Sequence, residues 1–172
     1  MNAYIDQLQS ARDAYDTNVF PGALPLLARL ELGDWLTANF RWDWFTTHTF
    51  KDEKTTPLKG TFCWFSWWNS IRLMAKAEGL PRPYYVRVGE IQEARSTPTV
   101  HYHCLIGGVQ PLRRLTAKDL WEVHGHARVL AYEHGRGANF YLGKYITKEG
   151  ASFDASHNLK NRLTRMPDIP RE

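Results

Sequence analysis

Alternation of apolar and polar positions marks the segments of this chain that we expect to form strands. Residues 41–50 (RWDWFTTHTF) carry aromatic and β-branched side chains at every second position, which predicts a first strand. Residues 84–93 and 99–108 are β-rich runs joined by a short polar segment, which predicts an antiparallel hairpin. Residues 127–133 (ARVLAYE) form another such run, so four strands are expected.

Apolar positions that recur every three or four residues predict the helices. The longest covers residues 57–78, because Thr56 can cap it, Pro57 suits its first turn and Gly79 closes it. Further helices are predicted at residues 4–16, 24–40, 117–125 after a Thr116 cap, and 138–150 with Gly150 at the end.

The order of these elements predicts the fold class. The order is strand, helix, hairpin, helix, strand and helix. It suits an α+β fold of the ferredoxin-like or RNA-recognition-like type, in which helices flank a central antiparallel sheet. The 172 residues fit one domain. Within it we expect an N-terminal helical extension (1–40), a core (41–149) and a C-terminal tail (150–172).

Composition narrows the partners and the setting. A formal charge of +4 and an aromatic content of 13% permit a nucleic-acid partner, with rings available to stack on bases. The two cysteines form no C-x-x-C pair, which argues against a disulfide framework or a zinc knuckle and fits a reducing, intracellular setting. No apolar run approaches the roughly 18 residues that a membrane span needs, so no membrane partner is expected.

Two histidines stand one residue apart in the second strand of the predicted hairpin. Because successive side chains of a strand point to opposite faces, His101 and His103 share a face. They are either part of a polar sheet surface or two ligands of a metal ion. A third ligand would come from the partner strand, where Glu90 is preferred to Glu93 because it lies in the strand body. Such a set suits catalytic Mg²⁺ or Mn²⁺.

The last predicted helix carries the sequence YLGKYITK. Tyr141 and Tyr145 are one helical turn apart, and Lys144 and Lys148 each follow a tyrosine by three residues, so each phenol has a cation within reach. The pattern is either an amphipathic helix with tyrosines at the edge of the core, or a nucleophile site in which positive charge favours the phenolate. Together with the histidine pair, it favours the second interpretation.

Three parts of the sequence, taken in order, resemble the three motifs of HUH endonucleases. They are FTTHTF, then VGEIQE together with TVHYHCLI, then YLGKYITK. The paired tyrosines are similar to those of rolling-circle replication initiators, namely the gene A-type proteins of single-stranded DNA phages and their bacterial plasmid and phage relatives. The resemblance runs from about residue 41 to residue 149. It implies the HUH endonuclease fold, metal binding by His101 and His103 with Glu90 as third ligand, and attack by Tyr145 or Tyr141. Tyr145 ranks first because Lys144-Tyr145-x-x-Lys148 also matches single-tyrosine relatives.

The resemblance also implies an activity. We expect a metal-dependent, sequence-specific endonuclease and strand transferase, which nicks and joins single-stranded DNA through a 5′-phosphotyrosine to initiate rolling-circle replication. Lys144 and Lys148 either lower the phenol pKa or bind a phosphate. The expected partners are single-stranded origin DNA, as a plain strand or a hairpin, and a separate helicase and polymerase in the cytoplasm of a bacterial cell that carries the phage or plasmid.

Other functions stay open at this point. An HUH transposase or relaxase would use the same chemistry, whereas a non-catalytic single-stranded DNA-binding module would stack bases on its sheet. A small metal-dependent hydrolase would leave both tyrosines dispensable. His48, in the first motif, is expected to serve packing or DNA contact rather than to act as an extra ligand.

Overall fold

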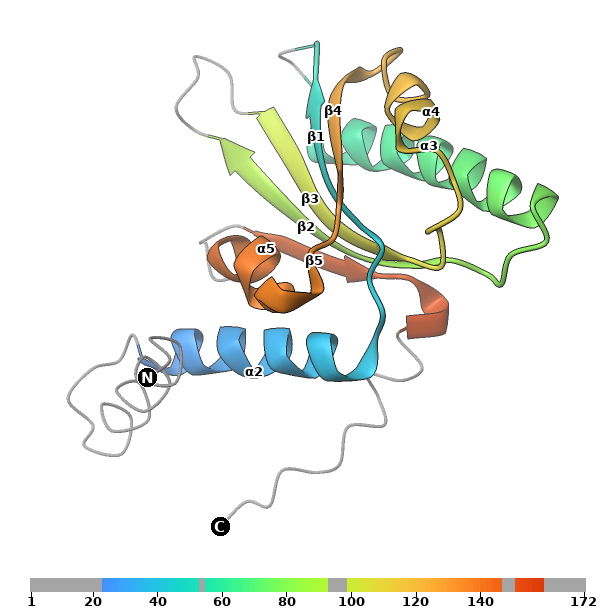
Figure 1. Ribbon diagram of the computed structural model, residues 1–172. Coiled ribbons are helices and arrows are strands. Elements are labelled where there is room, and N and C mark those ends of the chain that lie inside the picture. The colour runs from blue at the N-terminus through green and yellow to red at the C-terminus, as the bar shows by residue number, and fades with distance from the viewer. Residues whose placement is uncertain (1–22, 53–54, 93–98, 147–150, 160–172) are drawn as a thin grey trace.

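An antiparallel sheet of five strands, in the order β4-β1-β3-β2-β5, organises the fold (Figure 1). The computed structural model describes residues 23–52, 55–92, 99–146 and 151–159. The strands are β1 (Trp44–Phe50), β2 (Tyr84–Gln92), β3 (Thr99–Gly107), β4 (Gly125–Ala131) and β5 (Ser152–Ala155). Each neighbouring pair is antiparallel, and the helix between β1 and β2 crosses over an inserted β3. The predicted α+β class is therefore confirmed.

Helices lie on both faces of the sheet. They are α2 (Ala23–Asn39), α3 (Pro57–Ala77), α4 (Arg114–Asp119), the 3₁₀ helix η1 (His134–Arg136) and α5 (Gly137–Ile146). The pair α3 and α4 covers one face, whereas α5 lies on the other with α2 packed beneath it (Figure 1). The predicted helix at residues 4–16 and the expected end at Gly150 lie outside the described residues. No helix in the described ranges is long and apolar enough to cross a membrane.

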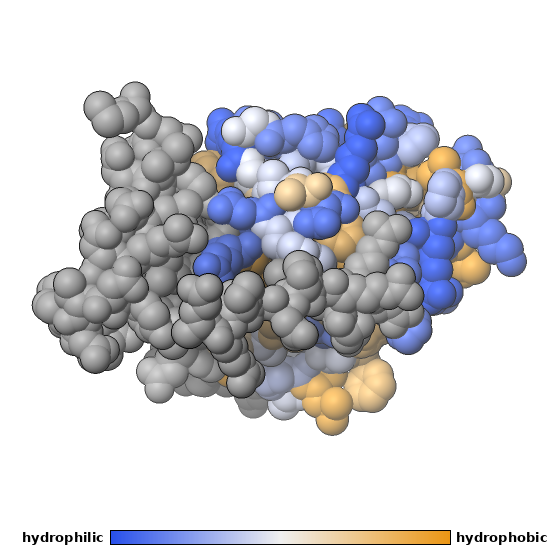
Figure 2. All heavy atoms as spheres, turned by 90° about the horizontal axis from the view of Figure 1, so that it is seen from below, coloured by the Kyte–Doolittle hydropathy of each residue, from blue (hydrophilic) through white to orange (hydrophobic). Residues whose placement is uncertain are grey.

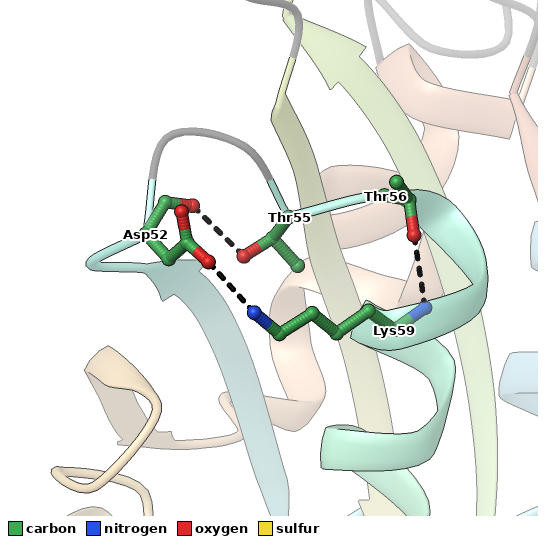
Figure 3. Close-up of polar contacts among 4 residues, drawn as sticks. All are labelled: Asp52, Thr55, Thr56 and Lys59. Atoms are coloured by element: carbon green, nitrogen blue, oxygen red, sulfur yellow. Dashed lines mark hydrogen bonds and ion pairs between the residues drawn. The ribbon is translucent and has the colours of Figure 1, made fainter.

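The start of α3 is fixed by polar contacts that follow directly from its first residues (Figure 3). The Thr56 hydroxyl accepts a hydrogen bond from the Lys59 backbone N–H at 3.2 Å, which confirms the predicted cap. Lys59 Nζ also donates to Asp52 Oδ2 at 2.7 Å, and the Thr55 hydroxyl donates to the Asp52 carbonyl at 2.8 Å. At the far end, Gly79 adopts a φ of 67°, which a side chain would disfavour.

The face of the sheet under α3 holds an aromatic core. The buried stripe of α3 consists of Gly60, Trp64, Trp67, Trp68, Ile71 and Ala75. Trp64 packs on Tyr85 with ring centroids 4.4 Å apart, and Trp67 Nε1 donates to the Ala117 carbonyl of α4 at 2.7 Å. The buried Arg87 guanidinium lies 4.7 Å from the centre of the Trp64 ring. The tryptophan side chains therefore hold α3 and α4 to the sheet.

His48 belongs to this core. It is 0% exposed, and its ring lies 4.5 Å from the ring centres of both Trp67 and Trp121. Its Nε2 is 2.9 Å from the Thr46 hydroxyl oxygen. Burial lowers the pKa of His48 to about 3, with smaller contributions from the charges of His103 and Arg87. The side chain is therefore neutral at physiological pH and serves packing.

Several elements differ from the sequence-based expectations, among them the first strand, which begins at Trp44 and not at residue 41. Thr116 lies inside α4 rather than at its cap, because the helix already begins after Arg113. The fourth strand begins at Gly125, where an added Cβ would meet the backbone of Phe50 at 2.8 Å, so the close pairing with β1 sets its start. The tail contributes β5, which pairs with β2 and which four residues were too few to predict.

Seen from below, the described surface is largely hydrophilic, and its hydrophobic areas are small and separate (Figure 2).

The buried neutral His48 predicts an acid-sensitive fold. The unfolded chain takes up a proton near pH 6.5, whereas the folded protein does so only near pH 3. Stability from this residue is therefore complete above pH 6.5 and is lost as the pH falls, by up to about 1.4 kcal/mol per pH unit. Urea unfolding of wild type and His48→Gln between these limits should show a smaller pH dependence in the variant. The exposed His157→Gln variant should follow the wild type, and a His48→Gln profile parallel to wild type would refute the assignment.

Candidate functional site

The histidines and the carboxylate predicted to act together lie on the sheet face opposite α3. In β3, His101 and His103 alternate with Tyr102, which points into the aromatic core. Glu90 of β2 stands directly opposite His101 in the antiparallel register. His101 is 8% exposed, His103 5% and Glu90 7%. The three residues therefore form a buried polar group beside the helix α5.

His103 is held by contacts at both ring nitrogens. Its Nε2 lies 3.3 Å from Oε2 of Glu90, and its Nδ1 lies 3.4 Å from the hydroxyl oxygen of Thr47 on β1. A buried carboxylate is costly without a compensating partner, and the imidazole offsets part of that cost. These contacts orient the ring between its two neighbouring strands.

Tyr145 reaches this group from the end of α5. Its ring stacks on that of His103, with centroids 3.6 Å apart and planes inclined by 8°. The side chain is half-buried rather than enclosed. The structure thus brings together His103, Glu90 and Tyr145, although they are far apart in the sequence.

Tyr141 lies one turn earlier on α5, in different surroundings. Its ring is 6% exposed and packs against Phe45 and Tyr132, each at 4.9 Å between centroids. Its hydroxyl accepts a hydrogen bond from the backbone N–H of Glu133 at 3.0 Å. Tyr141 is therefore part of the core between α5 and the sheet, in contrast to Tyr145.

Some predicted members of the site cannot be located. Lys144 lies on α5 between the two tyrosines, but the position of its side chain is outside what the structure describes. Lys148 and Glu93 both fall outside the described residues.

The donor types present fit a divalent ion. Imidazole and carboxylate groups share one face, and the 3.3 Å between Glu90 and His103 is close to the separation of about 3 Å that two ligands of one ion adopt. In the part of the chain that the structure describes, however, no three His, Cys, Asp or Glu side chains gather as a metal-binding group. His101 shares the face and the strand, without completing such a group.

A row of residues crosses the whole sheet through His103. Paired positions run from Arg128 through Thr47, His103 and Val88 to Phe153. Arg128 at one edge is exposed, and Phe153 at the other edge is 42% exposed. With strands about 4.8 Å apart, the row spans about 19 Å. Sequence analysis missed Arg128 and Phe153, because only the strand register aligns them with the histidine.

This chain matches none of the protein-family models, curated proteins or solved structures with which it was compared. The functional assignment therefore depends on the geometry and chemistry of the site.

Proposed function

We propose that this protein is a metal-dependent endonuclease and strand transferase for single-stranded DNA. It nicks and rejoins DNA through a 5′-phosphotyrosine and in this way initiates rolling-circle replication. The observation that carries the proposal is the stacking of Tyr145 on His103, 3.6 Å between ring centres, beside the Glu90 carboxylate. This contact joins the candidate nucleophile to the candidate metal ligands.

The proposed reaction is a transesterification at phosphorus. Tyr145 Oη attacks the scissile phosphate, the bond from phosphorus to the 3′ oxygen breaks, and a bond from phosphorus to the tyrosine oxygen forms. The phenol loses its proton, and the departing 3′ oxygen takes one up. A later attack by a 3′-hydroxyl on the phosphotyrosine reverses the exchange and joins DNA without a nucleotide cofactor.

Each residue of the site has a distinct task in this proposal. His101, His103 and Glu90 would hold a divalent ion, Mg²⁺ or Mn²⁺, which polarises the scissile phosphate when it is bound. Thr47 and Glu90 orient the imidazole of His103 from either side. Lys144 and Lys148, which follow Tyr141 and Tyr145 by three residues in the sequence, would supply positive charge that favours the phenolate. Tyr141 is a second candidate nucleophile, but its packing between Phe45 and Tyr132 assigns it first to the core.

The row across the sheet supports DNA as the substrate. An exposed arginine at one edge can bind a backbone phosphate, and an exposed phenylalanine at the other can stack on a base. Between these edges the row is covered, since Val88 is 0% and His103 5% exposed. A strand bound at Arg128 or Phe153 would therefore approach the site from an edge of the sheet.

A non-catalytic single-stranded DNA-binding module is the second candidate. The same edge residues, Arg128 and Phe153, would serve it, and such a module would need no metal ion. The two functions differ in whether a covalent product forms.

Covalent capture tests the nucleophile. After incubation with a pool of single-stranded DNAs, including hairpins, and Mn²⁺, we expect an adduct on Tyr145, found by denaturing gel and mass spectrometry. Tyr145→Phe should lower adduct formation by on the order of 10³-fold, because no oxygen remains to attack. Tyr141→Phe, which retains the ring, is the matched control and should keep most of it. An adduct on Tyr141 would make Tyr141 the nucleophile in place of Tyr145. The absence of an adduct with every DNA in the pool would favour the binding module.

Metal dependence tests the ligand set. A chelator should abolish adduct formation and Mn²⁺ should restore it, while His103→Asn or Glu90→Gln should weaken Mn²⁺ binding by at least about 10-fold. Calorimetric titration with Mn²⁺ measures this without DNA. The exposed His157→Asn variant should bind as the wild type does. Equal Mn²⁺ affinity in all four proteins would exclude the proposed ligands.

Base stacking at the sheet edge has its own test. Phe153→Ala should weaken binding of a short single-stranded oligonucleotide by about 1–3 kcal/mol, whereas Phe153→Trp should retain binding. Fluorescence anisotropy measures both affinities. Phe62→Ala is the matched control, because Phe62 is 68% exposed but lies on α3, across the sheet. Equal losses at Phe153 and Phe62 would argue against base stacking at this edge.

A further inference from the structure

Two clefts on the α3 and α4 side of the molecule are lined by cations. The first has a volume of about 300 Å³, and its cations are Arg72, Lys76 and Arg82. The second has a volume of about 540 Å³, and its cations are Arg113, Arg114 and Lys118. Apolar residues also line both clefts, including Leu80 in the first and Val129 in the second, and Asn69 adds an amide to the first. The two clefts therefore hold six cationic side chains, three in each, on the side of the sheet away from Tyr145.

The clefts are built alike. Arg72 and Lys76 stand at i and i+4 on α3, and Arg114 and Lys118 stand at i and i+4 on α4. Like charges at this spacing repel each other and destabilise a helix. Each pair is joined by one more cation from an adjoining segment, either Arg82 or Arg113.

These cations lack acidic partners within the described ranges. None of the six takes part in an ion pair there, whereas Lys59 and Arg136 each contact a carboxylate. Glu78 and Asp119 belong to the same region of the chain but line neither cleft. No carboxylate among the described residues is in contact with these cations, so an external anion would meet them without an ion-pair partner.

The segment that enters β2 lies beside the segment that leaves β3, and each of them lines one cleft. Pro83, which lines the first, contacts Gly108 so tightly that an added Cβ on Gly108 would lie 3.2 Å from its Cα. The chain then runs through Leu112, which lines the second cleft, into Arg113 and α4. The first cleft thus adjoins the segment before β2, and the second adjoins the segment after β3.

We propose that these clefts form a second nucleic-acid surface, which binds the phosphate backbone of DNA without reading its sequence. Concave clefts that hold three cations each are complementary in charge to a chain of phosphates. The choice of DNA among polyanions rests on the proposed function, but the anion surface itself does not. It would hold DNA that flanks the cleavage site while the opposite face acts on the single strand.

Charge-removing variants test the surface. Arg72→Gln with Lys76→Gln removes two of the three cations of the first cleft, and Arg114→Gln with Lys118→Gln removes two of the three cations of the second. Lys51→Gln with Lys59→Gln removes the same charge at the opposite end of α3 and is the matched control. Circular dichroism and thermal melting establish that all three double variants are folded.

Salt dependence of binding is the readout. Anisotropy titrations with a labelled duplex and a single strand of arbitrary sequence, between about 50 and 200 mM salt, give the slope of log K against log salt. Each cleft variant should lower that slope by about 1.8 on duplex or about 1.4 on single strand, because two phosphate contacts are lost. The control should keep the wild-type slope. Cleft variants with wild-type slopes, or a control that loses as much, would overturn the proposal.

Two parallel assays separate this surface from other interpretations. Cosedimentation with phosphatidylserine vesicles should be unaffected by the cleft variants; loss of vesicle binding with unchanged DNA slopes would assign the clefts to membranes and overturn the proposal. Covalent capture by the wild type reports on the nuclease separately. Lowered slopes without any adduct would support the surface and refute the nuclease, whereas an adduct with unchanged slopes would do the reverse.

Discussion

The register between β3 and its two neighbours is the constraint on which the rest of the structure depends. His103 faces the site only because Tyr102 faces the aromatic core, where its hydroxyl is 3.2 Å from that of Thr61 and its ring packs against Arg87. A slip of one residue would exchange the two faces of the strand. It would place an imidazole among the tryptophans and a large phenol beside Glu90, so the packing of one face secures the chemistry of the other.

One face of the sheet forms the aromatic core that stabilises the fold, and the other face carries the candidate site. Along β1, side chains that point toward α3 are buried and those that point the other way are only half-buried. The covered face excludes water so well that His48 cannot be protonated at neutral pH. The other face carries the polar group of His101, His103 and Glu90, which is itself largely buried beside α5. A rigid, apolar support beneath this polar group is a suitable base for a site that has to hold its groups in fixed positions.

The two tyrosines of α5 have different surroundings, although the helical period places them on the same face of the helix. Tyr141 and Tyr145 share a face of α5, yet Tyr141 meets Phe45 and the chain near Glu133, whereas Tyr145 extends beyond them to His103. The difference arises from where α5 crosses the sheet. If both tyrosines react in turn, Tyr141 has to leave a buried position, which makes the two steps unequal.

The sequence by itself determined most of the elements, β5 excepted, and the faces of their residues. Alternation along residues 99–108 was enough to pair His101 with His103, and capping residues were enough to set the start of α3, because both signals are local. It also identified Glu90 as a neighbour across the hairpin, since a hairpin links adjacent strands. Only the tertiary structure decided that Tyr145 rather than Tyr141 meets His103, that Arg128 and Phe153 align with it, and that two cationic clefts lie on the far side. Those relations depend on long-range strand order and on the crossing of helices, which no local period encodes.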